Sequence, residues 1–228
     1  MRLNNIQKRY GEKVVLDGVS LELREGEITC ILGRSGAGKT TLLNILAGLL
    51  PYEGEIFPMP KKVGYVFQES RLLPYLTVRE NLLYAGGKPE WIDETLQKAG
   101  LAALADRKAG SLSGGEKRRV ALLRAFCVDA DLVLLDEPFS ALDTVSKAQM
   151  LGLAWDFIRS GGLAAVFVTH DLDEAISIAD TVLVLDEGKI VHTMRLPAAK
   201  EPREYGKYAK ERQQLLDVMK NTKELGRI

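Results

Sequence analysis

The sequence predicts an α/β protein built around a parallel sheet. Apolar runs of strand length at Glu27–Leu32, Asp131–Leu135 and Leu163–Val168 alternate with segments of helical periodicity. If Asp131–Leu135 and Leu163–Val168 lie in a central parallel sheet, they are covered on both faces, as the strands of parallel sheets are. The glycine-rich segment Gly33–Lys39 joins the first run to a predicted helix, which is the strand–loop–helix order of half a βαβ unit.

Composition narrows the class of protein. The chain has 228 residues, of which 46% are hydrophobic and 27% charged, so it can bury the core of one domain. Its 31 basic and 31 acidic residues cancel, which argues against a strongly basic nucleic-acid-binding protein. No apolar run reaches the roughly 18 residues that a membrane helix needs, and Met1–Asn5 lacks the apolar stretch of a secretory signal. Cys30 and Cys127 fit neither a disulfide framework nor a zinc site. We therefore expect a soluble cytosolic protein with reduced thiols.

The N-terminal elements follow from local pattern. Val14–Leu23 alternates loosely and predicts a strand, and Lys62–Phe67 predicts another short strand. Between them, Thr40–Leu50 predicts a helix with one apolar face, made of Leu42, Leu43, Leu46 and Leu49.

The pattern becomes helical after Ser70. Thr77 is placed to cap a helix that runs through Tyr84, and Pro89 opens a second helix that runs through Leu101. A third helix is expected over Gly114–Phe126, with its apolar positions at Val120, Leu122, Leu123 and Phe126.

The C-terminal part combines a hairpin with a polar tail. Thr181–Asp186 and the residues after it, through Val191, predict two strands with a turn at Gly188. The tail from Lys200 to Ile228 carries eight basic and five acidic residues, a net charge of +3, and has apolar residues at helical spacing. It predicts a C-terminal helix that is docked or partly mobile.

The glycine-rich segment predicts a phosphate site. Gly33-Arg34-Ser35-Gly36-Ala37-Gly38-Lys39-Thr40 has the pattern G-x-x-x-x-G-K-[ST], between a strand and a helix, with Thr41 following. Its glycines let the backbone turn its N–H groups and the helix N-terminus toward an anion. Lys39 would reach the β- and γ-phosphates, and the Thr40 hydroxyl would hold Mg²⁺.

A buried strand delivers two carboxylates to the same edge of the sheet. Leu132–Leu135 is apolar, and Asp136 and Glu137 follow directly. Ligands of parallel sheets bind at the carboxyl ends of the strands. Asp136 would orient the shell of the Mg²⁺ ion, and Glu137 would polarise an attacking water as general base. Together with the phosphate loop, this pair predicts a nucleoside triphosphate-binding protein.

Four further features fit a nucleotide site. Leu112–Glu116 opens a helix with a serine and two glycines, which makes a second place where an anion could bind. Gln68 follows one strand and His170 ends another, so both reach the edge where Glu137 lies. Ser140–Asp143 follows Glu137 closely. Taken singly, each has an ordinary structural interpretation, such as a serine-capped helix for Leu112–Glu116.

Together these segments resemble the ATP-binding subunit of ATP-binding-cassette (ABC) transporters, over nearly the whole chain. In the terms used for that family, the motifs are Walker A at Gly33–Thr40, the Q-loop at Gln68, the signature at Leu112–Glu116, Walker B at Leu132–Asp136 with catalytic Glu137, the D-loop at Ser140–Asp143 and the switch histidine His170. Glu116 departs from the family, which most often has Gln there. Tyr10 falls where the family places an aromatic ring that stacks on adenine.

The resemblance implies ATP as the nucleotide, Mg²⁺ as cofactor and a homodimer of ATPase subunits. The residues that would hold Mg²⁺, partly through water, are Thr40, Gln68 and Asp136; the catalytic residues would be Lys39, Gln68, Glu137 and His170. Two copies would pack head to tail, so that a segment of one copy closes on the γ-phosphate held by Lys39 of the other. That segment is Ser113, Gly114, Gly115 and Glu116, and Asp143 would connect the two sites.

The resemblance also implies an architecture and partners. It implies a P-loop NTPase (RecA-like) core with an N-terminal antiparallel β subdomain and an inserted small helical subdomain. One ABC ATPase domain would span 1–228, with the β subdomain and core at 1–69 and 112–196, the helical subdomain at 70–111 and a helical tail at 197–228. The partners would be transmembrane permease subunits and a solute-binding protein, with no nucleic acid, at the cytoplasmic face of the inner membrane.

The segment after the Q-loop indicates the class of transporter. Phe67–Leu82, FQESRLLPYLTVRENL, resembles ATPases of bacterial importers for nitrate, sulfonates, taurine or thiamine precursors. It is rich in apolar residues for a loop near the surface. We expect part of it, including Leu73 and Tyr75, to line a groove for a short helix of the permease.

Three other interpretations compete with this one. A soluble ABC ATPase without a membrane partner is the alternative, and copurification with a membrane protein distinguishes the two. A P-loop GTPase would need a Lys-x-Asp segment to bind guanine, and the sequence contains none. A P-loop small-molecule kinase would need neither Leu112–Glu116 nor His170.

Overall fold

The structure is a computed structural model that describes residues 1–140, 142–204 and 206–225. Ala141 in the predicted D-loop, and Tyr205 and residues 226–228 in the predicted tail, lie outside the described residues.

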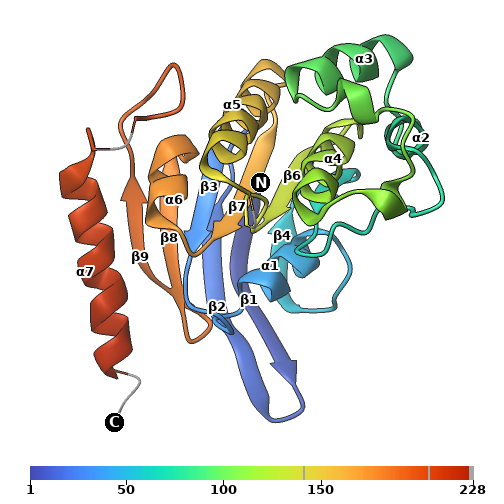
Figure 1. Cartoon of the computed structure of the whole chain (residues 1–228). Helices are drawn as coiled ribbons and strands as arrows, with labels where there is room; N and C mark the ends of the chain where they lie inside the picture. Colours follow the sequence, from blue (N-terminus) through green and yellow to red (C-terminus); the bar gives the residue numbers. More distant parts are fainter. Residues whose placement is uncertain (141, 205, 226–228) are drawn as a thin grey trace.

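A six-stranded sheet forms the centre of the molecule (Figure 1). Its order is β5 (Val63–Val66), β6 (Leu132–Asp136), β7 (Ala164–Thr169), β3 (Ile28–Leu32), β8 (Thr181–Asp186) and β9 (Lys189–Arg195). The first five strands are parallel, and β9 returns antiparallel to β8 through a turn at Gly188. The predicted parallel sheet and the predicted hairpin are therefore confirmed.

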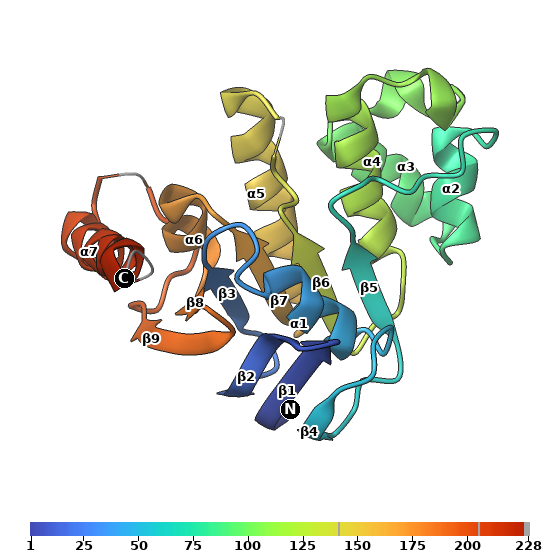
Figure 2. The same cartoon turned by 90° about the horizontal axis from the view of Figure 1, so that it is seen from below.

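A second, antiparallel sheet covers one face of the first. It has three strands in the order β2 (Lys13–Glu22), β1 (Arg2–Tyr10) and β4 (Glu53–Phe57). Figure 2 shows helix α1 (Lys39–Leu46) between the two sheets. This arrangement places the first residues of β2, around Val15, against the loop that precedes α1.

The alternation of side chains along the strands divides the core into two layers. Ile31 of β3 and Leu134 of β6 face α1 and the antiparallel sheet. Their neighbours Cys30 and Leu135 face the helices on the opposite side. Both layers are fully buried at these positions, which explains why the strands read as continuous apolar runs.

The opposite face is covered by helices α4 (Gly114–Phe126), α5 (Thr144–Ser160) and α6 (Leu172–Ile178). Beyond α4, a group of short helices extends from the β5 edge of the sheet (Figure 1): α2 (Val78–Tyr84), α3 (Pro89–Lys98) and two 3₁₀ turns at Ala102–Leu104 and Ala109–Ser111. Helix α2 begins with the predicted cap, since Thr77 and Glu80 form a capping box.

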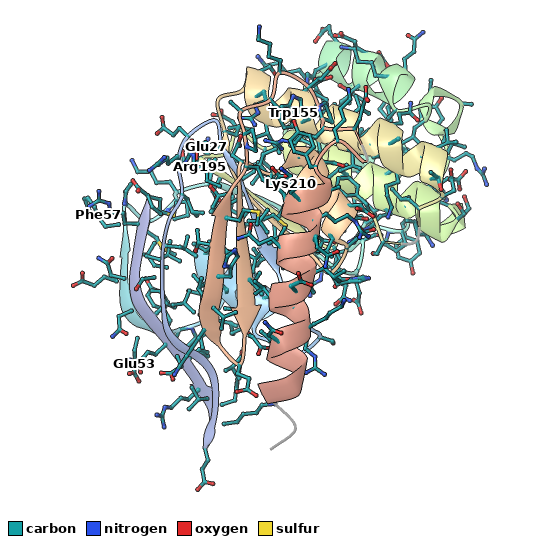
Figure 3. The ribbon with its side chains drawn as sticks, turned by 90° about the vertical axis from the view of Figure 1, so that its left-hand side faces the viewer. Glu27, Glu53, Phe57, Trp155, Arg195 and Lys210 are labelled. Atoms are coloured by element: carbon teal, nitrogen blue, oxygen red, sulfur yellow. The ribbon has the colours of Figure 1, made fainter. Side chains whose placement is uncertain are left out.

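The tail folds as helix α7 (Ala209–Leu225), which packs against α6 and β8 and lies across the near side of the molecule in Figure 3. Leu215 is fully buried against the core. An ion pair of 2.7 Å joins Arg212 to Asp173 of α6, and the buried Arg203 donates hydrogen bonds to the carbonyls of Ile176 and Ala179. The predicted C-terminal helix is therefore present, and it is docked.

Two predicted helices end earlier than expected. The helix predicted to reach Leu50 ends at Leu46, and the one predicted to reach Leu101 ends at Lys98. In both, a glycine with positive φ (Gly48 at 70°, Gly100 at 64°) reverses the chain, and the following residue donates back to the last turn. Leu49 consequently leaves the apolar face predicted for it and is 56% exposed.

Within the described ranges, every helix is too short or too polar to cross a lipid bilayer.

Candidate active site

The phosphate loop fits tightly between the two sheets. A Cβ atom on Gly33 would lie 2.3 Å from the carbonyl oxygen of Leu185 in β8. Gly38 has a φ of 103°, and a Cβ there would lie 2.8 Å from the carbonyl oxygen of Val15 in β2. No other residue fits either position, so the loop can only take this path with glycine.

Lys39 lies inside this loop. Its side chain is buried, and Nζ donates hydrogen bonds of 2.8 Å to the carbonyls of Gly33 and Arg34. Burial lowers the pKa of Lys39, and the charges of Glu137 and Asp136 oppose that shift. An ammonium held under the loop, beside the N-terminus of α1, provides positive charge where a phosphate would bind.

Asp136 ends strand β6 and is buried. Burial raises the pKa of Asp136, while a hydrogen bond with the Thr40 hydroxyl lowers it. A carboxylate and a hydroxyl in contact, with the Gln68 amide lining the same cavity, are oxygen donors of the kind that Mg²⁺ prefers. The residues present therefore fit the predicted magnesium ion.

Glu137 has an unusual backbone conformation. Its φ is 47°, in the left-handed region that costs most residues energy. Its N–H donates to the Val168 carbonyl at 2.9 Å, and its own carbonyl accepts the Ser140 hydroxyl at 2.8 Å. The side chain points toward His170, with 3.3 Å between Glu137 Oε1 and His170 Nδ1. The conformation thus turns the carboxylate away from the strand and toward His170.

One cavity of about 240 Å³ brings nine of the predicted site residues together. The predicted nucleotide-site residues that line it are Tyr10, Ser35, Gly36, Gly38, Lys39, Thr40, Thr41, Gln68 and Glu137. Lys13 and Val15 also line it, although the sequence did not single them out. The same loop contains Gly33, Arg34 and Ala37, which do not line the cavity; the carbonyls of Gly33 and Arg34 accept from Lys39. Two further predicted residues contact lining residues: Asp136 is hydrogen-bonded to Thr40, and His170 contacts Glu137.

The remaining predicted residues lie elsewhere. Ser113, Gly114, Gly115 and Glu116 do not line this cavity, and they form the first turn of α4. Ser113 and Glu116 make a capping box, in which Glu116 accepts from the Ser113 N–H at 2.7 Å. That bond lowers the pKa of Glu116. Asp143 caps α5 by accepting from Val145 and Ser146.

Arg118 was not among the residues predicted from the sequence. This residue lies on α4, is 4% exposed, and contacts the backbone at the ends of both β5 and β6. Its position was a usable signal, because Arg118 precedes Leu122 by one helical turn and so falls on the predicted apolar face. A charged residue on a buried face needs partners, and here the partners belong to the candidate site.

The fold and the site define the class. In the parallel sheet, one strand enters a helix through a glycine-rich loop that holds a buried lysine, and a neighbouring strand ends in two carboxylates. These features together define a P-loop nucleoside triphosphatase.

Comparisons with known proteins specify the family. Residues 16–140 match the ABC transporter family. The chain is 43% identical over 194 residues to the aliphatic sulfonates import ATP-binding protein SsuB 3 of Paraburkholderia xenovorans, an alignment covering 82% of this chain and 77% of that protein. It is 40% identical over 223 residues to SsuB 2 of Rhizobium johnstonii, covering 95% and 89%.

Two solved structures are similar to this chain along most of its length. The dimeric structure of MJ0796, a bacterial ABC transporter cassette, matches with a TM-score of 0.78 and 31% identity, over 87% of this chain and 99% of that one. A second dimeric structure of MJ0796, in a post-hydrolysis state bound to ADP and Pi, matches with a TM-score of 0.77. The chain belongs to the ABC transporter family and is an ATP-binding and ATP-hydrolysing member of it.

Proposed function

We propose that this chain is the ATPase subunit of a bacterial ABC importer for a small organic anion of the aliphatic sulfonate type. The observation that carries the ATPase part is the single cavity lined by Lys39, Thr40, Gln68 and Glu137. The importer and the solute class rest on the relatives, which are named as aliphatic sulfonates import ATP-binding proteins and are about 40% identical to most of this chain.

In this proposal the phosphate loop and Lys39 bind the triphosphate, and Tyr10 stacks on the adenine. Tyr10 is half exposed at the mouth of the cavity, as a stacking platform needs to be. Thr40, Asp136 and Gln68 would hold Mg²⁺, partly through water, and the bound ion supplies positive charge for the phosphate oxygens.

Glu137 is proposed to accept the proton of the attacking water. His170 would hold the γ-phosphate and that water in line, since its ring contacts the Glu137 carboxylate directly. Neither residue forms a bond to phosphorus, so the rate enhancement comes from position and charge.

The signature segment is proposed to act on a second copy of the chain. Because Ser113–Glu116 does not line the cavity of its own chain, it can contact a γ-phosphate only in another copy. The two MJ0796 structures are dimeric, which supports a homodimer. The capping box uses the N–H groups of Ser113 and Glu116, so those of Gly114 and Gly115 would remain to face such a phosphate, and Asp143 would connect the two sites.

A groove next to the Q-loop is the proposed seat of the permease. Its volume is about 280 Å³, and it lies between β5 and α4, lined by Leu49, Tyr65, Phe67, Ala85 and Arg124 among others. Apolar side chains stand exposed around it, Leu49 at 56% and Tyr84 at 78%. An apolar groove with an exposed apolar rim suits a short amphipathic helix.

The loop that carries Leu73 and Tyr75 is held in a fixed shape. The buried Asn81 accepts a hydrogen bond from the Leu73 N–H at 2.8 Å and donates to the Thr77 carbonyl at 2.9 Å. Tyr75 at the tip of this loop is 85% exposed. A rigid loop that presents an unpaired aromatic ring supports a contact with a partner rather than core packing.

Two variants test the coupling. Tyr75→Asp should abolish solute-stimulated ATP hydrolysis by the reconstituted transporter and leave basal hydrolysis by the isolated chain unchanged. Val191→Asp is the matched control, because Val191 is 48% exposed on β9, at the opposite edge of the sheet from β5. Full coupling in the Tyr75 variant would contradict the assignment of the loop that carries Tyr75 to the permease contact.

The solute, the binding protein and the location need their own experiment. Membrane subunits that copurify with the chain from the inner membrane would be reconstituted with the solute-binding protein, and hydrolysis would be followed with alkane sulfonates, taurine and nitrate. We expect stimulation by sulfonates. Failure of any membrane protein to copurify would favour a soluble ABC ATPase.

A further inference from the structure

Arg118 is the one residue of α4 that touches both of the segments proposed to act on the attacking water. Its Nη1 atom donates to the carbonyls of Phe67 at 2.5 Å and Gln68 at 2.9 Å. Its Nη2 atom donates to the carbonyl of Asp136 at 2.6 Å and to that of Glu137, and its Nε atom to that of Pro138 at 3.0 Å. One guanidinium therefore joins the Q-loop to the end of β6.

These contacts use the whole hydrogen-bonding capacity of the side chain. A guanidinium has five N–H donors in a planar fork, and each of the five is directed at a different backbone carbonyl. A buried cation is stable only when it is fully hydrogen-bonded. Lysine, with three donors on one atom, could not reach both segments at once.

The contacts also bear on the backbone of Glu137. That residue adopts the unfavourable left-handed conformation, which persists only where neighbouring groups enforce it. Arg118 binds the carbonyls immediately before, at and after this position, namely those of Asp136, Glu137 and Pro138. Helix α4 lies directly against β5, so the guanidinium is itself held in place by packing (Figure 2).

We propose that Arg118 is a positioning residue for ATP hydrolysis, which fixes the Glu137 carboxylate and the Gln68 amide at the distance the reaction needs. This inference rests on the proposed roles of those two residues. It also gives the first turns of α4 a mechanical connection to the catalytic groups of the same chain, since Arg118 follows the Ser113–Glu116 turn directly.

The test is a double-mutant cycle on ATP hydrolysis by the full chain. Arg118→Gln should lower kcat by about 10- to 100-fold through misplacement of Glu137, with KM and the affinity for a fluorescent ATP analogue unchanged within about threefold. In a Glu137→Gln background the same substitution should lower the residual rate by a smaller factor than in the native background, because one of its two targets is already removed. Arg119→Gln is the matched control: it lies on the same helix, carries the same charge, and among the described residues its guanidinium donates a hydrogen bond to the Ala99 carbonyl, at 3.4 Å, rather than to the Q-loop or the end of β6.

The outcomes distinguish a failure of the positioning role from a failure of the proposed function. A native chain that does not hydrolyse ATP contradicts the proposed function itself. If the native chain hydrolyses ATP, two results overturn the positioning role. One is an Arg118→Gln variant with a normal kcat. The other is a double variant whose fall in rate is the full product of the falls caused by Arg118→Gln and Glu137→Gln separately. If Arg118→Gln does not fold, Arg118→Lys replaces it. The lysine variant should be slow, because one ammonium cannot reach both segments, and a lysine variant of native rate contradicts the proposal.

Discussion

The backbone of Glu137 should store measurable free energy, and replacing the residue with glycine should release it. Glu137→Ala keeps a Cβ atom at a φ of 47°, whereas Glu137→Gly removes it. Comparing these two variants with each other cancels the loss of the carboxylate. What remains is the difference between a strained and an unstrained backbone.

The magnitude follows from two opposing terms. A left-handed conformation costs an L-residue about 1–2 kcal/mol, and glycine avoids this cost. Glycine is also more flexible in the unfolded chain, which destabilises the folded state by roughly 0.5–1 kcal/mol relative to alanine. We expect Glu137→Gly to be more stable than Glu137→Ala by about 0.5–1 kcal/mol, which corresponds to a rise of about 1–4 °C in Tm for a domain of this size.

Urea unfolding without nucleotide measures this difference. The control is Ala148→Gly, at an exposed position in α5, where the helical backbone imposes no such strain. There glycine should destabilise the protein by roughly 0.5–1 kcal/mol, so the two alanine-to-glycine changes should have opposite signs. A Glu137→Gly variant that is less stable than Glu137→Ala would refute the claim that the site is strained.

Three further predictions concern stability. Because the pKa of Glu116 is lowered, its cap stabilises the folded chain at pH values above the ordinary pKa of a glutamate, and this stability is lost as the pH falls through the lowered pKa. Glu116→Ala should therefore lower Tm at pH 7, and the difference in Tm between the variant and the native chain should disappear in acid. Leu215→Ala should cost about 2–5 kcal/mol by leaving a cavity under α7, seen as a lower Tm and easier proteolysis of the tail, whereas the exposed Gln214→Ala should change neither. The raised pKa of Asp136 means that its buried charge destabilises the folded chain at neutral pH. Asp136→Asn should therefore unfold at the same or a higher temperature in EDTA, while losing Mg²⁺-dependent hydrolysis. A lower Tm would contradict the claim that burial of the Asp136 charge is unfavourable.

The elements that could be predicted were those whose signal is local. The phosphate loop, the apolar strands and the helix over Gly114–Phe126 appear where expected, because glycine spacing, continuous apolar runs and helical periodicity are properties of neighbouring residues. Thr77 was found for the same reason, since a capping box spans only four residues.

The elements that could not be predicted depend on distant contacts. Strand β4 is almost entirely polar or exposed, and only its pairing with β1 makes it a strand. Leu49 was assigned to a helix face because the leucine spacing continued beyond Gly48, where the chain in fact reverses. The place of Arg118 on the apolar helix face indicated that it is buried, but its five acceptors could not be predicted, because they come from two segments that are remote in sequence and meet only in the folded chain.

The central claim is that two copies of the chain enclose ATP between the phosphate loop of one and the signature turn of the other. Light scattering on the Glu137→Gln variant tests it most directly, with saturating ATP and Mg²⁺. We predict a stable dimer that contains two ATP molecules and is lost when Lys39→Ala is added. A variant that binds ATP and remains monomeric under these conditions, even with its membrane subunits present, would contradict the account.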